Sequence, residues 1–193
     1  MVFISIQPFA LKRVSLLIAA IVCLLTASCF ADSVFLNVDA TPYDHQMGRI
    51  RPVLLSSKGH RDGRQVSFAL VNHWIEDLRG IPYGFSQEWK TPQEVESGAV
   101  ADCKGKSVAL YKRMEDSGAS NVRLVIGRRT STSRMTHAWL VWETDNGTYV
   151  LDPTINWAAY KTEQLGRHTY IPLYAYSGSH KYRAAASALY AKN

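Results

Sequence analysis

A predicted helix that begins at a cysteine limits the folds open to this chain more than any other feature. Asp102 stands immediately before Cys103 and is a favourable N-cap, and Gly118 is a favourable residue just beyond the helix end. Between them, apolar side chains repeat at helical spacing from Cys103 to Ser117. The first turn of a helix has unpaired N–H groups and a partial positive charge, so this position stabilises a thiolate.

The same helix is predicted to have a buried face and a charged face. The buried stripe comprises Cys103, Ser107, Leu110, Tyr111 and Met114. The charged side chains that we expect mostly to point away from it are Lys104, Lys106, Lys112, Arg113 and Glu115. This pattern predicts that one side of the helix packs against the rest of the domain.

Three β-strands are predicted after this helix. Residues 122–126, 136–143 and 148–152 are rich in β-branched and aromatic side chains, and residues 144–147 have turn chemistry. The stretch 128–134 is basic and rich in Ser and Thr, and it is predicted to be a mobile loop. The change from helical to strand patterning predicts an α+β fold, with the cysteine-bearing helix packed on an antiparallel sheet.

The turn between the second and third of these strands decides where two polar residues meet. With a four-residue turn, Glu143 lies opposite Thr148, and His137 then falls opposite Thr154. In that register Asp152 is a diagonal neighbour of His137 on the same face of the sheet. A three-residue loop would instead turn Asp152 to the other face. The sequence permits this His–Asp pair without requiring it.

Further elements are predicted on either side of this region. A helix over residues 64–79 is apolar on two faces and ends at Gly80, so we expect it to be largely buried. Residues 91–94 (Thr-Pro-Gln-Glu) form a capping-box signature that starts a short helix. Near the C-terminus, a last strand is predicted at 170–176 and an Ala-rich helix at 183–190.

Residues 1–31 have the pattern of a secretory signal peptide. Two basic residues precede a short apolar run at 14–25, and a small-x-small cleavage site ends at Ala31. We therefore expect cleavage after Ala31 and a periplasmic or secreted protein. The alternatives are a lipoprotein signal, with a lipid anchor on Cys29, and an uncleaved anchor.

Composition indicates a globular domain. Apolar residues make up 47% of the 193 residues and charged residues 20%, which argues against a disordered or fibrous chain. Residues 32–193 show no repeat and no break in composition, so they are predicted to form a single domain. Without residues 1–31 the formal net charge falls from +6 to +4. This mild, dispersed charge does not indicate nucleic-acid binding.

Cysteine usage excludes a disulfide scaffold. Cys23 and Cys29 lie within the predicted signal, so Cys103 is the cysteine that remains after cleavage. It then has no intramolecular disulfide partner. A lone thiol in an oxidising compartment is a liability unless it is buried or useful.

Cys103, His137 and Asp152 together predict thiol chemistry. A neighbouring imidazole activates a cysteine nucleophile, and a carboxylate can hold that ring and stabilise the imidazolium. Each residue alone has a simpler explanation: a small buried side chain for the cysteine, a structural contact for the histidine, and a turn for the aspartate before Pro153. Their order along an exported chain favours the catalytic hypothesis, in which Asp102 serves as the helix cap.

Three stretches resemble the transglutaminase-like superfamily: Ala-Asp-Cys-Lys at 101–104, Thr-His-Ala-Trp at 136–139 and Val-Leu-Asp-Pro-Thr at 150–154. The segment Trp-Lys-Thr-Pro-Gln-Glu at 89–94 is similar to the lead-in segment of bacterial transglutaminase-like cysteine proteinases, which include periplasmic adhesin-cleaving proteases. The resemblance covers residues 66–156. It implies a papain-like fold with Cys103 as nucleophile, His137 as general base and acid, and Asp152 as orienting carboxylate.

Two positions depart from the pattern of that family. Ala101 stands where a glycine usually precedes the Asp-Cys pair. Lys104 and Lys106 follow the cysteine, whereas the proteinase group tends to have acidic residues there, in a segment linked to calcium binding. Because calcium prefers several carboxylate or carbonyl oxygens, we expect no metal or other cofactor, and calcium is disfavoured rather than excluded. The sequence favours the superfamily over the adhesin-cleaving group.

Tyr83 and Trp89 are further candidate site residues, which could line the cleft or assist an oxyanion. Core packing is the simpler role for both aromatic side chains. Other motifs are absent from the sequence: no glycine-rich phosphate loop and no His/Cys cluster with zinc spacing is present.

The sequence therefore predicts an exported cysteine peptidase or amidase that acts on a protein or peptide amide through a thioester. Its expected partner is a protein or peptide substrate, which export would place at the cell envelope, and no nucleic acid is expected. Two alternatives stay open. One is a protein-glutamine transglutaminase, in which an amine replaces water. The other is a non-catalytic envelope binding module of the same fold.

Overall fold

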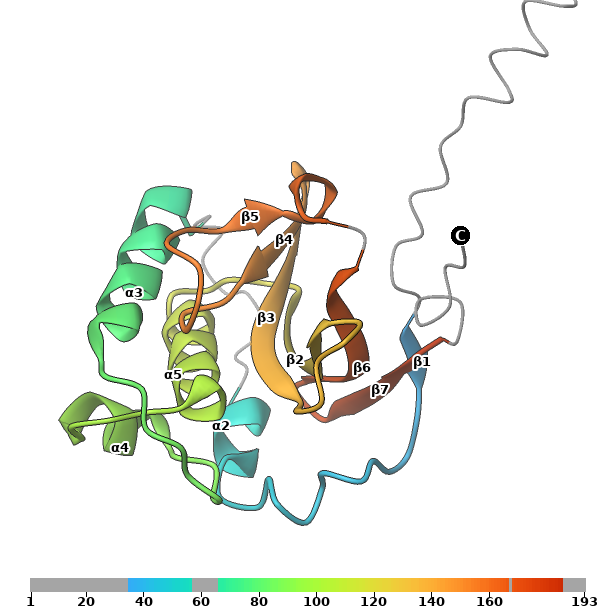
Figure 1. Ribbon diagram of the computed structural model, residues 1–193, viewed down its shortest axis with the longest axis horizontal. Helices are drawn as coiled ribbons and strands as arrows, with labels where there is room; N and C mark the ends of the chain where they lie inside the picture. Colours follow the sequence, from blue (N-terminus) through green and yellow to red (C-terminus); the bar gives the residue numbers. More distant parts are fainter. Residues whose placement is uncertain (1–34, 57–65, 167, 186–193) are drawn as a thin grey trace, which may run out of the picture. The chain divides into compact units, whose positions relative to one another are not determined.

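Three stretches of the chain, residues 35–56, 66–166 and 168–185, are described by a computed structural model. They form a sheet with helices packed against it, which confirms the predicted α+β class (Figure 1). The predicted signal peptide lies outside the described residues. Within the described stretches, no helix is long and apolar enough to cross a membrane.

The described residues contain a seven-stranded antiparallel sheet in the order β1-β7-β6-β2-β3-β4-β5. The strands are β1 (Phe35–Asn37), β2 (Val122–Thr130), β3 (His137–Thr144), β4 (Gly147–Leu151), β5 (Tyr160–Lys161), β6 (Thr169–Ser177) and β7 (His180–Ala184). The helices are α2 (Arg51–Leu55), α3 (Phe68–Gly80), α4 (Pro92–Ser97), α5 (Cys103–Asp116) and the 3-10 helix η1 (Thr162–Gln164). Strand β2 is therefore central, with β3 beside it.

Helix α5 packs on the two central strands, as predicted (Figure 1). Its buried residues include the whole predicted stripe, from Cys103 to Met114. The Ser107 hydroxyl also donates a hydrogen bond of 3.0 Å to the carbonyl oxygen of Ala138 in β3. This buried polar contact ties the first turns of the helix to the strand that carries His137.

Both predicted helix starts are confirmed. At α4, the Thr91 hydroxyl accepts from the Glu94 amide at 3.4 Å, and Glu94 Oε2 accepts from the Thr91 amide at 2.8 Å. At α5, Asp102 Oδ1 accepts from the Gly105 amide at 3.1 Å. Each cap satisfies N–H groups that have no partner inside the helix.

The prediction that Lys106 points away from the buried side of α5 is wrong. Its side chain is buried, with the residue only 2% exposed, and its ammonium donates to the carbonyl oxygens of Arg79 and Ile81. These carbonyls lie at the C-terminal end of α3, where helical acceptors lack partners. Burial, followed by the charge of Arg79, lowers the pKa of Lys106. Lys106 therefore joins α5 to the end of α3.

Helix α3 is buried on one face rather than on two. It begins at Phe68, where the Ser67 hydroxyl accepts from the Leu70 amide at 3.2 Å, and its buried residues are Val71, Ile75 and Leu78. Leu70 is exposed. The prediction of a largely buried helix is thus wrong, because α3 flanks α5 at the side of the domain and only one of its faces meets the core (Figure 1).

Two predictions about the C-terminal half are also wrong. The basic stretch 128–134 is not wholly a loop, because β2 continues to Thr130 and pairs there with Thr169 of β6. At the C-terminus, Arg183 and Ala184 belong to strand β7 instead of starting a helix. The rest of the predicted helix, from residue 186 onwards, lies outside the described residues. The predicted strand at 170–176 is confirmed as β6.

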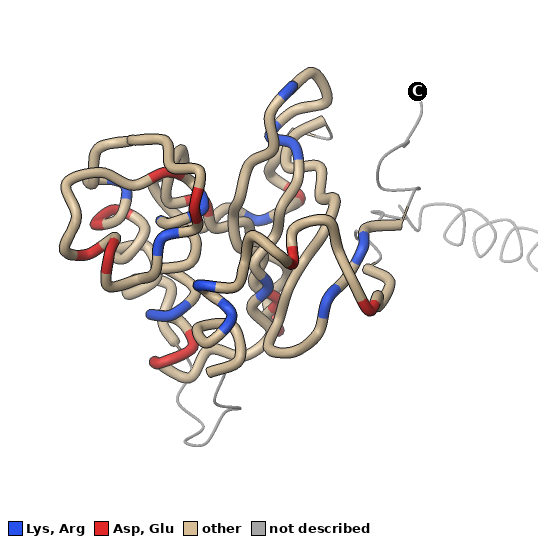
Figure 2. Tube along the Cα trace, turned by 90° about the horizontal axis from the view of Figure 1, so that it is seen from below, with Lys and Arg blue, Asp and Glu red and all other residues tan. Residues whose placement is uncertain are grey.

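Basic and acidic residues are interspersed over the described chain, as Figure 2 shows. Several of them pair across elements, for example Arg49 with Glu88 and Arg113 with Glu96. This distribution agrees with the dispersed charge expected from the sequence.

Gly127 lies where the pairing of β2 with β6 shifts its register. A Cβ atom at this position would stand 2.2 Å from the carbonyl oxygen of Ile171 and 2.6 Å from the ring of Trp139. The backbones of β2 and β6 can approach this closely only because the residue has no side chain. The close approach matters for the site, because His137 is the β3 partner of Gly127.

We expect Gly127→Ala to lower the free energy of unfolding by about 3 kcal/mol or more, since neither backbone nor indole can yield without shifting the sheet. Urea denaturation measures the change. Gly48→Ala is the matched control, because a Cβ atom there would meet nothing within 4 Å. Equal stabilities of the two variants would contradict the close packing at Gly127.

Candidate active site

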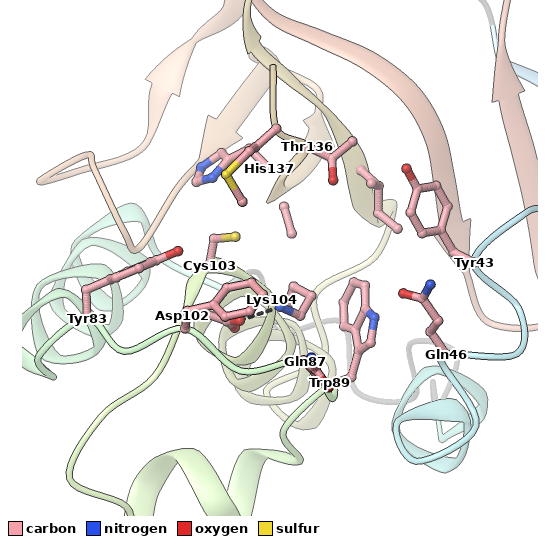
Figure 3. Close-up of a pocket in the computed structure, with 14 residues that line it drawn as sticks. Tyr43, Gln46, Tyr83, Gln87, Trp89, Asp102, Cys103, Lys104, Thr136 and His137 are labelled. Carbon is pink, nitrogen blue, oxygen red and sulfur yellow. Dashed lines mark hydrogen bonds and ion pairs between the residues drawn. The ribbon is translucent and has the colours of Figure 1, made fainter. Parts of the chain in front are cut away.

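A cleft of about 200 Å³ opens between the start of α5, the start of β3 and the segment 83–89. Figure 3 shows Cys103 and His137 facing each other across one part of it, with Tyr43 and Gln46 at the far side. The other lining residues are Tyr83, Phe85, Gln87, Trp89, Asp102, Lys104, Ile126, Met135, Thr136 and Ala138. The cleft thus has mostly aromatic, apolar and amide walls around one thiol.

Cys103 is the first residue of α5, as predicted from its position after the Asp102 cap. It has no disulfide partner among the described residues and is 8% exposed, so its thiol is sheltered but borders the cleft. The helix start places the thiol beside unpaired backbone N–H groups, which favour a negative charge.

The predicted strand register is confirmed. Glu143 pairs with Thr148 across the β3–β4 turn, so Asp152, just beyond β4, becomes the diagonal neighbour of His137. The distance from His137 Nε2 to Asp152 Oδ2 is 2.7 Å. The carboxylate therefore holds Nε2, which leaves Nδ1 as the ring nitrogen available to the cleft.

The three side chains influence one another electrostatically. Burial alone would lower the pKa of His137, but hydrogen bonds to Asp152 and Cys103 outweigh it and raise the pKa from 6.5 to about 9. Burial would raise the pKa of Asp152, but His137 and the other donors to the carboxylate lower it below its usual value. At neutral pH the pair is thus an imidazolium held by a carboxylate.

Asp152 has two further donors that the sequence did not predict. The Thr154 amide donates to Oδ1 at 3.0 Å, and the Tyr170 hydroxyl lies 2.9 Å from Oδ2. Tyr170 is on β6, which the chain reaches only after β5 and η1. No local pattern in the sequence could place it beside Asp152, because the contact depends on the packing of the whole sheet.

The two predicted aromatic site residues differ from each other. Trp89 is 1% exposed and packs in the core while also bordering the cleft, in line with the simpler role. Tyr83 is 59% exposed, so core packing is wrong for it. Its hydroxyl points toward Cys103 in Figure 3, and burial, followed by the charges of Cys103 and Asp102, raises its pKa. Backbone pairing with Ala101 fixes its position.

Lys104 occupies the region where the family resemblance raised the question of calcium. Its ammonium pairs with the buried Asp102 carboxylate and donates to the Ser86 carbonyl oxygen at 2.8 Å. The same carboxylate accepts from the amides of Ser86 and Gly105. No group of three or more His, Cys, Asp or Glu residues in the described stretches could hold a metal ion. The Lys104 ammonium already neutralises the Asp102 carboxylate, so these residues are a poor fit for calcium at the start of α5.

Comparisons of sequence find no match for this chain. No protein-family model and no curated protein matches it. Solved structures of Legionella pneumophila LapG, a transglutaminase-like cysteine protease, are similar in fold. The EGTA-treated form has a TM-score of 0.54 at 14% identity, covering 72% of this chain and 75% of LapG. The calcium-bound form has a TM-score of 0.53 at 15% identity, covering 71% and 75%.

The chain has a distant transglutaminase-like fold. A third LapG structure agrees, with a TM-score of 0.52 at 13% identity over 74% of this chain and 80% of LapG. At these identities the likeness concerns the transglutaminase-like fold alone. This fold is the one implied by the resemblance of residues 101–104, 136–139 and 150–154, whereas the roles of individual residues must be argued from their geometry.

Proposed function

We propose that this protein is a cysteine hydrolase that cleaves an amide bond in a peptide or protein through a thioester on Cys103. The observation that carries the proposal is the alignment of three side chains: the Cys103 thiol and the His137 ring in the cleft, and Asp152 Oδ2 at 2.7 Å from His137 Nε2. The transglutaminase-like fold, similar to that of a cysteine protease, supports the proposal at the level of the fold.

In the proposed mechanism, Cys103 Sγ attacks the carbonyl carbon of the substrate, and the carbonyl electrons move onto oxygen. When the tetrahedral intermediate collapses, the C–N bond breaks and the His137 imidazolium gives its proton to the leaving amine. The acyl group is then a thioester on Cys103. His137, now neutral, takes a proton from water, and the water oxygen attacks the thioester carbonyl. The C–S bond then breaks, which releases a carboxylic acid and leaves the Cys103 thiolate beside the His137 imidazolium.

The negative charge on the substrate oxygen needs donors close to Cys103. The backbone N–H of Cys103 lies at the helix start and serves as one donor. The Tyr83 hydroxyl points toward the same place and serves as a second, with its proton retained because its pKa is raised. Trp89 forms part of the cleft wall, where its buried ring supports the segment that carries Tyr83.

Export and independence from calcium are parts of the same proposal. The pattern of residues 1–31 supports export to the periplasm or beyond, where a protein or peptide of the cell envelope would be the substrate. The ammonium of Lys104 supports activity without calcium, because it already balances Asp102 at the start of α5.

The test is a cleavage assay of the purified protein with a mixture of quenched fluorescent peptides in H₂¹⁸O. We expect new termini with one heavy oxygen in each new carboxylate, unaffected by EGTA. A parallel assay offers a fluorescent primary amine and casein. Amine incorporation without cleavage would favour the transglutaminase alternative. The absence of both reactions would overturn the enzyme proposal and leave the non-catalytic binding module.

A further inference from the structure

We propose that Tyr170 is a positioning residue, whose hydroxyl fixes the Asp152 carboxylate in the orientation that holds His137. The inference rests on the proposed function, in which His137 moves protons at Cys103. Tyr170 does not border the cleft, so it would act through Asp152 and not on the substrate.

The hydroxyl of Tyr170 lies between two oxygen atoms. It is 2.9 Å from Asp152 Oδ2 and 3.0 Å from Asn156 Oδ1. A phenol has one proton, and a carboxylate is the stronger acceptor, so the proton belongs to Asp152. Asn156 Nδ2 is buried with no partner among the described residues. A half-turn of that amide would let Nδ2 donate to the phenol oxygen, while the phenol donates to Asp152.

Asp152 Oδ2 then accepts from two side chains, Tyr170 and His137, while Oδ1 accepts from the Thr154 amide. Rotation of the carboxylate would break contacts to all three donors together. Because Asp152 is fully buried, water cannot replace any of them. The hydroxyl of Tyr170 reaches Oδ2 from β6, a strand that does not pair with β4, and it completes the restraint.

The backbone at Tyr170 is unusual for a residue of its size. Its φ is +52°, in the left-handed region, a conformation that is strained for a bulky residue. The ring is held by an edge contact to Trp139, at 5.3 Å between centroids, and by the Arg129 guanidinium 4.3 Å from its centroid. These contacts maintain the strained backbone and aim the hydroxyl at Asp152.

Burial, followed by the charge of Asp152, raises the pKa of Tyr170 well above its usual value. The hydroxyl therefore keeps its proton throughout the range in which the enzyme would work. Its role is that of a fixed donor, and it takes no part in proton transfer.

The experiment compares Tyr170→Phe with a control on the same strand, Tyr176→Phe. Tyr176 is also buried, and its hydroxyl meets Thr41 instead of the site. We expect Tyr170→Phe to lower kcat 5- to 20-fold with KM nearly unchanged, while Tyr176→Phe changes kcat less than twofold. The phenylalanine ring keeps the contacts to Trp139 and Arg129, so the melting temperature should change no more than in the control.

A second readout follows the proton shared by His137 and Asp152, which gives a low-field NMR signal. We expect Tyr170→Phe to shift or broaden this signal and Tyr176→Phe to leave it in place. Loss of stability alone would not move it. If Tyr170→Phe does not fold, Asn156→Ala is the second variant, because it removes the other contact of the Tyr170 hydroxyl. We expect it to change the same NMR signal and to lower kcat 2- to 5-fold.

The outcomes separate the two proposals. If the wild-type protein cleaves nothing, the proposed function fails, and the NMR signal still decides whether Tyr170 positions Asp152. The inference about Tyr170 is overturned if its phenylalanine variant retains kcat within twofold and gives the wild-type signal.

Discussion

Replacing Cys103 with alanine is expected to abolish amide hydrolysis while the fold stays nearly unchanged. The thiol supplies the nucleophile, and no other cysteine lies in the described residues to replace it. Its loss should lower kcat/KM by about 10³-fold or more, to the level that binding and oxyanion donors give alone. The substitution removes only the sulfhydryl group, from a side chain that borders the cleft. The free energy of unfolding should therefore change by only about 1 kcal/mol.

The assay is peptide cleavage, with urea denaturation as the check on folding. Ser107→Ala is a matched control on the same helix, one turn further on. Its hydroxyl contacts the Ala138 carbonyl and does not border the cleft. We expect this control to lose some stability and little activity. Activity retained by Cys103→Ala would exclude the thioester route.

Asp152→Asn is expected to reduce kcat/KM by about 10²- to 10⁴-fold. The substitution keeps the size of the side chain but removes the charge that stabilises the His137 imidazolium. It also places an amide where His137, Tyr170 and the Thr154 amide all donate, so at least one donor loses its acceptor. The pKa of His137 should fall from about 9 toward its ordinary value of 6.5.

The same substitution should change how stability depends on pH. A histidine whose folded pKa is raised stabilises the fold fully below its unfolded pKa, and this stabilisation is lost as pH rises through the folded value. At pH 6 we expect Asp152→Asn to be less stable than wild type by roughly 2 kcal/mol. The difference in the free energy of unfolding between the two proteins should become smaller between pH 6.5 and 9. Denaturation at several pH values measures it, and a gap that widens with pH would contradict the pairing.

Local chemistry made part of the site predictable. The side chain of Asp102 acts over a few residues, so the start of α5 follows from the sequence. The turn at 144–147 is equally local, and it limits β3 and β4 to a few registers, one of which the structure adopts. The register then brings His137 beside Asp152, although the two residues are 15 positions apart.

Contacts that depend on the complete fold could not be predicted from the sequence. The sequence around Lys106 is typical of a solvated lysine. In the structure its side chain is buried, because its ammonium donates to carbonyl oxygens at the end of α3. Tyr170 resembles any strand aromatic until β6 pairs with β2 and a positive φ aims its hydroxyl. Tyr83 is exposed because pairing with Ala101 holds it at the edge of the cleft. In each case the decisive neighbour is far along the chain.

The most direct test of the central claim is the rate at which iodoacetamide alkylates Cys103 between pH 4 and pH 10, in wild type and in His137→Ala. An ordinary thiol has a pKa near 8.5 and reacts slowly at pH 6. The proposed activation of Cys103 by His137 predicts that, at pH 6, Cys103 is alkylated at least tenfold faster in the wild type than in the variant. A wild-type rate that follows an ordinary thiol and does not depend on His137 would contradict the proposed nucleophile.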